Sequence, residues 1–200
     1  MLELWRCSKK IVTLVALFSL MISTFSFRIP VVSAAVITEF GGAITTAGTF
    51  QRPKWPYDVK IETGDESLDY PDFTKVYSGN EAVGTMSGTY HYFTRNLIPS
   101  ADGNYTIAVD AANTNLPDGG EDNPNDTHML LYDGSFDPTN PLENLMYGNE
   151  DKVSSDTDFD LTSHIPKVFL TANHTYVLVL TTYSPGVTGP AALTIDGPGQ

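Results

Sequence analysis

Carboxylate and amide side chains are concentrated in two stretches of this 200-residue chain, and oxygen ligands of this kind suit a divalent cation. The first set is Asp118, Glu121, Asp122 and Asp126, and the second is Asp133, Asn149, Glu150, Asp151, Asp156, Asp158 and Asp160. Calcium takes about six to eight oxygens, which irregular loops can deliver without a fixed spacing. We therefore predict a calcium site with the candidate ligands Asp126, Asp133, Asn149, Glu150, Asp151 and Asp158. The alternative is a solvated acidic surface that binds no ion.

Catalytic patterns have less support in the sequence than cation binding. The four histidines, His91, His128, His164 and His174, do not form the His-Glu-x-x-His pattern of a zinc protease. The chain also lacks a Gly-x-Ser-x-Gly nucleophile turn and an EF-hand loop. Two carboxylates held across a cleft would hydrolyse a glycosidic bond, but so many acidic residues identify no single pair. We expect a protein that is not an enzyme, with a small carbohydrate-active hydrolase as the alternative.

Aromatic side chains are a second possible source of binding. The candidates are Trp55, Tyr57, Tyr70, Phe73, Tyr77, Tyr90, Tyr92 and Phe93. Alternate aromatic residues in a β-sandwich usually fill its core, whereas an exposed row of rings would stack on sugars. Trp55 lies in a segment with Pro53 and Pro56, which favours a loop, so we predict that Trp55 is exposed and binds a ligand.

The first 34 residues have the layout of a secretory signal. Basic residues precede an apolar run that starts at Ile11, and Val32-Ser33-Ala34-Ala35 supplies small residues for cleavage. The alternative is a retained anchor, because the 17 residues from Ile11 to Phe27 carry no charge. We favour cleavage, which predicts a mature chain without a membrane span that is secreted or held at a bacterial surface.

Charge and cysteine content narrow the range of partners. Residues 1–34 hold four basic residues and one acidic residue, so their removal lowers the net charge from −13 to −16. A chain this acidic repels nucleic acid and anionic lipid. Its one cysteine, Cys7, lies in the predicted signal, so the mature chain would have neither a disulfide nor a Cys-ligated zinc.

Short β-prone segments separated by turn residues predict an all-β, antiparallel, jelly-roll-like sandwich. The expected strands are 36–40, 48–51, 57–62, 74–77, 89–95, 104–110, 129–132, 142–147, 165–170, 174–182 and 191–195. We expect 129–132 and 142–147 to form a hairpin, and 89–95 to pair with 104–110. Segment 174–182 is apolar at both parities, which predicts a central strand covered on both faces. The predicted organisation is a signal (1–34), a lead-in (35–47) and one sandwich domain (48–199).

Several motifs in this order resemble bacterial exported β-sandwich modules, the pre-peptidase C-terminal domains and related repeats. They are Asp126-Thr127, Leu131-Tyr132, Gly134-Ser135-Phe136-Asp137-Pro138, Asn140-Pro141-Leu142, Asn149-Glu150-Asp151, Thr175-Tyr176-Val177-Leu178-Val179 and Gly197-Pro198-Gly199. The chain departs from the family pattern at Glu150, where the modules tend to have Asp, and at Asn173, where they have Gly. Asn173 tolerates the left-handed backbone that Gly would supply.

The resemblance implies a sandwich fold and leaves the function open, because such modules accompany proteases and adhesins alike. We expect a secreted or cell-surface, non-catalytic binding or structural module with calcium as its cofactor. Its partner would be an extracellular polysaccharide or protein. A purely structural spacer that binds nothing is a third possibility.

Overall fold

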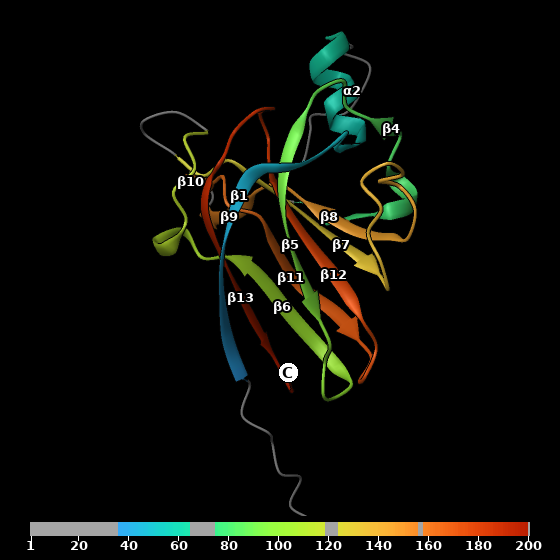
Figure 1. Cartoon of the computed structure of the whole chain (residues 1–200), viewed down its shortest axis with the longest axis vertical. Coiled ribbons are helices and arrows are strands. Elements are labelled where there is room, and N and C mark those ends of the chain that lie inside the picture. Colours follow the sequence, from blue (N-terminus) through green and yellow to red (C-terminus); the bar gives the residue numbers. More distant parts are fainter. Residues whose placement is uncertain (1–35, 65–74, 119–123, 156–157, 200) are drawn as a thin grey trace, which may run out of the picture. The chain divides into compact units, whose positions relative to one another are not determined.

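The computed structural model describes residues 36–64, 75–118, 124–155 and 158–199, and they form an almost entirely β structure (Figure 1). The strands are β1 (Val36–Phe50), β2 (Pro53–Lys54), β3 (Tyr77–Ser78), β4 (Gly84–Thr85), β5 (Tyr90–Leu97), β6 (Gly103–Val109), β7 (Thr127–Asp133), β8 (Leu145–Asn149), β9 (Lys152–Ser155), β10 (Asp158–Asp160), β11 (His164–Leu170), β12 (Tyr176–Thr182) and β13 (Gly189–Gly197). The helices are α2 (Pro56–Thr63) and the 3-10 helices η1 (Gly79–Glu81) and η2 (Ala111–Asn113). The predicted signal lies outside the described residues.

Nine strands form one curled antiparallel sheet in the order β11-β6-β13-β1-β5-β12-β7-β8-β3. The first part of β1 pairs with β13 and its last part pairs with β5, so β1 joins the two layers of the sandwich (Figure 1). Three further pairs are nested inside the β1–β13 pair: β5 with β12, β6 with β11, and β7 with β8. These nested pairs are the topology of a jelly roll, so the predicted fold is confirmed.

The main core lies between the two layers. One layer contributes residues such as Tyr105, Ile107 and Leu193, and the other contributes residues such as Leu131 and Leu178. Alternation along β6 buries every second side chain, as expected for a strand with one covered face. Every residue of β12 is buried, so the predicted central strand covered on both faces is confirmed.

A second apolar cluster covers the face of β5, β12 and β7 that points away from the main core, which we call the outer face. Leu130, Tyr132, Val177 and Val179 lie in this cluster. Trp55 packs there with an exposed fraction of 0%, stacked on the ring of Tyr77 at 5.3 Å. The predicted exposure of Trp55 is therefore wrong, because the segment after β1 folds back over the sheet and buries the indole.

The predicted strand at Tyr57–Glu62 is also wrong, because α2 occupies this segment. Pro56 stands at the first helical position, where its fixed φ and missing N–H cost nothing. The Asp58 carboxylate accepts the backbone N–H of Trp55 at 2.7 Å, which caps the first turn. The proline at the first helical position and the Asp58 cap favour a helix, although the alternation of apolar and polar residues indicates a strand.

Two further predictions about strand connections differ from the structure. β1 is one continuous strand from Val36 to Phe50, and the expected lead-in is part of the sandwich. β5 and β6 do not pair with each other, because the chain between Leu97 and Gly103 crosses from one layer to the other. The β7–β8 hairpin is as predicted. No helix in the described ranges has the length and apolar character that a membrane span needs.

Candidate functional site

Five acidic residues lie at the end of the sandwich where β7 begins, and their charges act on Asp126, on Asp151 or on the nearby Tyr183. We call them the acidic cluster. They are Asp118, Asp126, Glu150, Asp151 and Asp160. Asp126 immediately precedes β7, and Glu150 and Asp151 connect β8 to β9. Antiparallel pairing of β7 with β8 brings these two places together, because Met129 lies opposite Asn149.

Backbone hydrogen bonds fix the position of Asp126. Its N–H donates to the carbonyl of Asp118 at 3.4 Å, and its carbonyl accepts the N–H of Tyr183 at 3.1 Å. The residue before it, Asn125, has a positive φ of 73° and receives the N–H of Leu116 on its side-chain oxygen at 2.7 Å. Asn tolerates this conformation, so the turn into β7 is built into the sequence.

Some carboxylates of the acidic cluster have hydrogen-bond partners. Asp118 Oδ2 accepts the N–H of Ser184 at 2.9 Å. Asp160 Oδ1 accepts the N–H and the hydroxyl of Thr162 at 3.0 and 2.6 Å. By contrast, Oδ1 of Asp126 and Oδ1 of Asp151 are buried and have no hydrogen-bond partner among the described residues. A buried charge in that condition is costly unless a proton or a cation joins it.

Because ionisation of these two buried carboxyl groups is costly, the pKa values of Asp126 and Asp151 are raised. Burial, followed by the charges of Asp118 and Asp151, raises the pKa of Asp126 from 3.8 to about 8. Burial and then the charge of Asp160 raise the pKa of Asp151 from 3.8 to about 7. Both groups are therefore poised to hold protons near neutral pH or to exchange them for a cation.

Arg52 supplies positive charge beside the acidic cluster. It is fully buried, and its Nη2 forms an ion pair with Asp58 Oδ1 at 3.1 Å. Its charge lowers the pKa of Asp126, although burial and the neighbouring carboxylates outweigh it. The guanidinium also lies over the ring of Tyr183 at 5.5 Å, and burial is the main cause that raises the pKa of Tyr183 to about 12.

His128 lies next to this site but is not available as a metal ligand in this arrangement. Its ring is completely buried, and its Nε2 accepts the indole N–H of Trp55 at 2.9 Å. Burial and then the charge of Arg52 hold its pKa well below the usual value, so the ring is neutral. The atoms near the cluster that remain available as metal ligands are oxygens.

The structure brings together only part of the predicted ligand set. Asp126, Glu150 and Asp151 lie at the cluster, whereas Asp133 is at the far end of β7. Asp133 is exposed and pairs with His174. The amide of Asn149 holds the local backbone, since its Oδ1 accepts the N–H of His164 at 2.6 Å. The side chain of Asp158 and residues Glu121, Asp122 and Asp156 lie outside the described residues.

Sequence analysis missed two residues at this site, Arg52 and Tyr183. Arg52 contacts the ring of His128, which is 76 positions away, and no local spacing indicates such a pair. Within the described residues, no three His, Cys, Asp or Glu side chains stand in positions that would already hold a metal ion. A cation at the cluster would therefore require carboxylates to rotate toward it.

Comparisons with known proteins give a distant structural likeness. No family model matches the chain, so its resemblance to the pre-peptidase C-terminal modules stays a prediction. No curated protein matches it. Among solved structures, the chain is similar to the K3 cleaved adhesin domain of Lys-gingipain from Porphyromonas gingivalis, with 12% identity over 64% of this chain and 93% of that chain. The TM-score is 0.28, and a likeness at this level supports no statement about the present chain.

Proposed function

We propose that the protein is a non-catalytic binding module that works outside the cell and takes up a calcium ion at the acidic cluster. The observation that carries this proposal is the pair of buried carboxylate oxygens without a hydrogen-bond partner, Asp126 Oδ1 and Asp151 Oδ1. Burial of an unpaired carboxylate costs several kcal/mol, and a bound cation offsets that cost.

Calcium fits these donors better than zinc does. Zinc prefers histidine and cysteine in compact tetrahedral sites, whereas the acidic cluster offers carboxylates from irregular connections. Calcium accepts carboxylate, amide and backbone oxygens at about 2.3–2.6 Å in flexible geometry. Such flexibility suits a cluster whose carboxylates must turn toward the ion.

Action outside the cell follows from the amino-terminal segment and the charge. Residues 1–34 have the layout of an export signal, and extracellular fluid supplies calcium at the millimolar level that weak extracellular sites need. A net charge of −16 after removal of that segment disfavours nucleic acid and anionic lipid as partners. An extracellular polysaccharide or protein is the partner we propose.

A thermal melt of the purified protein, first in chelator and then in millimolar calcium, tests the cation. Calcium at 100 times its dissociation constant adds about 2.7 kcal/mol, which raises the midpoint by roughly 5–11 °C for a domain of this size. Magnesium, and sodium at equal ionic strength, serve as ion controls. Asp151→Asn should abolish the shift, and Asp133→Asn, which changes a carboxylate remote from the cluster, should keep it. Equal midpoints in chelator and calcium would refute the calcium site.

A carboxylate-pair glycosidase is the second candidate, favoured by one observation. A general acid needs a raised pKa beside an ionised carboxylate, and the pKa of Asp126 is raised next to Asp118 and Asp151. Release of reducing ends from a polysaccharide, lost in Asp126→Asn, would establish this activity and overturn the non-catalytic function.

A further inference from the structure

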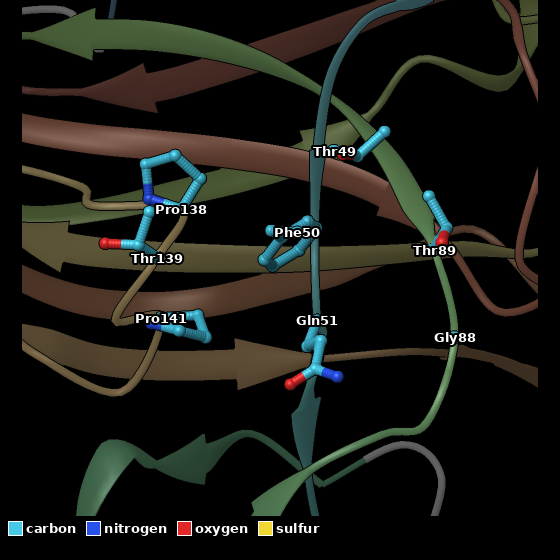
Figure 2. Close-up of a pocket in the computed structure, with 8 residues that line it drawn as sticks. All are labelled: Thr49, Phe50, Gln51, Gly88, Thr89, Pro138, Thr139 and Pro141. Atoms are coloured by element: carbon cyan, nitrogen blue, oxygen red, sulfur yellow. The ribbon is translucent and has the colours of Figure 1, made fainter.

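Two hollows lie side by side on the outer face of the sandwich, and no residue of the acidic cluster lines either of them. The first has a volume of about 330 Å³ and is lined by the end of β1, the segment before β5 and the loop that follows β7 (Figure 2). The second, of about 360 Å³, is lined by β5, Val177 of β12 and the same loop. Both hollows include Pro138, so they meet there, and together we call them the outer-face groove.

Three aromatic rings that pack on one another line the two hollows. Phe50 lines the first hollow, whereas Tyr92 and Phe136 line the second. Their ring centroids are 5.2–5.5 Å apart and each pair meets edge to face. Figure 2 shows Phe50 between the loop that carries Pro138 and the segment that carries Thr89. The groove therefore has a rigid aromatic centre.

No Asp, Glu, Lys, Arg or His lines the groove, although the chain has a net charge of −13. Hydroxyl and amide side chains supply its polar groups: Thr49, Gln51, Thr89, Thr94, Asn96 and Ser135. These six residues are exposed, and they both donate and accept hydrogen bonds. A neutral ligand rich in hydroxyl groups matches this lining, whereas a polyanion would meet neither a basic side chain here nor an attractive field from the chain.

Hydrogen bonds within the loop after β7, which lines both hollows, hold that loop in place. Asp137 Oδ1 accepts the N–H and the hydroxyl of Thr139, both at 2.8 Å, which forms an Asx turn. The hydroxyl of Tyr132 donates to the carbonyl of Pro141 at 2.8 Å and ties the loop to β7. A rim that is already ordered costs less to fix around a ligand.

β5 lies beneath the second hollow. It pairs with β1 at Tyr90–Tyr92 and with β12 at Phe93–Leu97. Thr94 and Asn96 of β5 supply a hydroxyl and an amide to the lining of this hollow. These side chains and the aromatic rings are the groups that a ligand in the groove meets.

We propose that the outer-face groove binds a neutral oligosaccharide, such as a segment of an uncharged cell-wall or capsular glycan. This inference deepens the proposed binding function and rests on it. Sugar hydroxyls bond to Gln51 in the first hollow and to Asn96 in the second, while a sugar ring packs on the aromatic centre between them.

Native gel electrophoresis through immobilised polysaccharides tests the groove, because an acidic protein migrates readily in such gels. The panel contains neutral β-glucan, galactomannan and xylan, anionic alginate and polygalacturonate, and gelatin as a polypeptide. At least one neutral polysaccharide should retard the protein, and the anionic ones should not. Gln51→Ala and Asn96→Ala should each weaken binding about tenfold in a calorimetric titration with the corresponding oligosaccharide. Asn104→Ala, an exposed residue of β6 in the other layer, is the matched control and should bind as the unchanged protein does.

The outcomes separate this inference from the proposed function. If Gln51→Ala and Asn96→Ala keep their melting midpoints and a neutral polysaccharide still retards both, the groove is not the binding site, but the proposed binding function stands. Release of reducing ends from a polysaccharide bound in the groove would overturn the non-catalytic function and leave the groove as its binding site. Retardation by gelatin alone would identify a polypeptide as the occupant, and no retardation by any polysaccharide would overturn the neutral-glycan proposal.

Discussion

Replacement of Asp126 by Asn should stabilise the protein when calcium is absent. The pKa of Asp126 is raised from 3.8 to about 8, and the difference corresponds to about 6 kcal/mol at roughly 1.4 kcal/mol per pH unit. The side chain is partly exposed, so we halve the value for solvent screening, to about 3 kcal/mol. Asn has nearly the same shape and no charge, so it removes the cost of ionising this position.

The sign of the effect depends on pH. A raised carboxyl pKa means that the folded protein binds its proton more tightly than the unfolded chain does. The associated stability is complete below about pH 4 and is lost as the pH rises through about 8. The gain from Asp126→Asn should therefore be largest at pH 8.5 and should shrink to less than about a third of that value at pH 5.

Thermal melts in chelator at pH 8.5 and pH 5, followed by circular dichroism, measure this effect. We expect Asp126→Asn to raise the midpoint at pH 8.5 by about 6–12 °C. Asp133→Asn is the matched control: it makes the same substitution on an exposed side chain at the other end of β7, and it should bring no gain at either pH. An Asp126→Asn midpoint at or below that of the unchanged protein at pH 8.5 would refute the description of Asp126 as an uncompensated carboxylate.

Three further predictions concern the same fold. Asp58→Asn removes the charge that lies 3.1 Å from the buried Arg52 guanidinium, and it should lower the free energy of unfolding in urea by about 3–5 kcal/mol; a loss below 1 kcal/mol would show that this ion pair is dispensable. Gly148→Ala would place a methyl group 2.3 Å from the Trp55 ring, and overpacking should cost about 1–3 kcal/mol in the same assay, whereas an unchanged urea midpoint would contradict the close packing. In chelator the unchanged protein should lose stability between about pH 4 and pH 8, because the unfolded chain releases the protons of Asp126 and Asp151 at lower pH than the folded protein does, in which their pKa values are about 8 and about 7; saturating calcium should flatten this pH profile, and a profile that rises with pH would contradict the raised pKa values.

The sequence predicted the strands that depend on local pattern. The run from His174 to Thr182 has apolar residues at both parities, and β12 is buried on both faces as that pattern indicates. Asn173 was expected to accept a left-handed turn, and its φ is 59°. The Gly134–Pro138 motif was expected to connect a hairpin, and it joins β7 to β8. In each of these cases the information lies within about ten residues of chain.

The features that sequence analysis missed depend on contacts between distant segments. Trp55 looked exposed because Pro53 and Pro56 suit a loop, and its burial depends on Tyr77 and on the Trp55–His128 hydrogen bond. Asp133 and Asn149 belong to the same acid- and amide-rich stretch of sequence, but β7 separates Asp126 from Asp133 by about 23 Å at roughly 3.3 Å per residue. Position along a strand, which the hairpin register sets, decides which carboxylates meet.

Isothermal titration of the purified protein with calcium at pH 7, in two buffers of different ionisation enthalpy, tests the central claim most directly. Calcium at the acidic cluster must displace protons from Asp126 and Asp151, whose pKa values are about 8 and about 7. We therefore expect saturable binding that releases about one proton per calcium ion, and the release should fall in Asp126→Asn. Absence of calcium binding, or binding with no proton release and no change in Asp126→Asn, would contradict a cation site at this cluster.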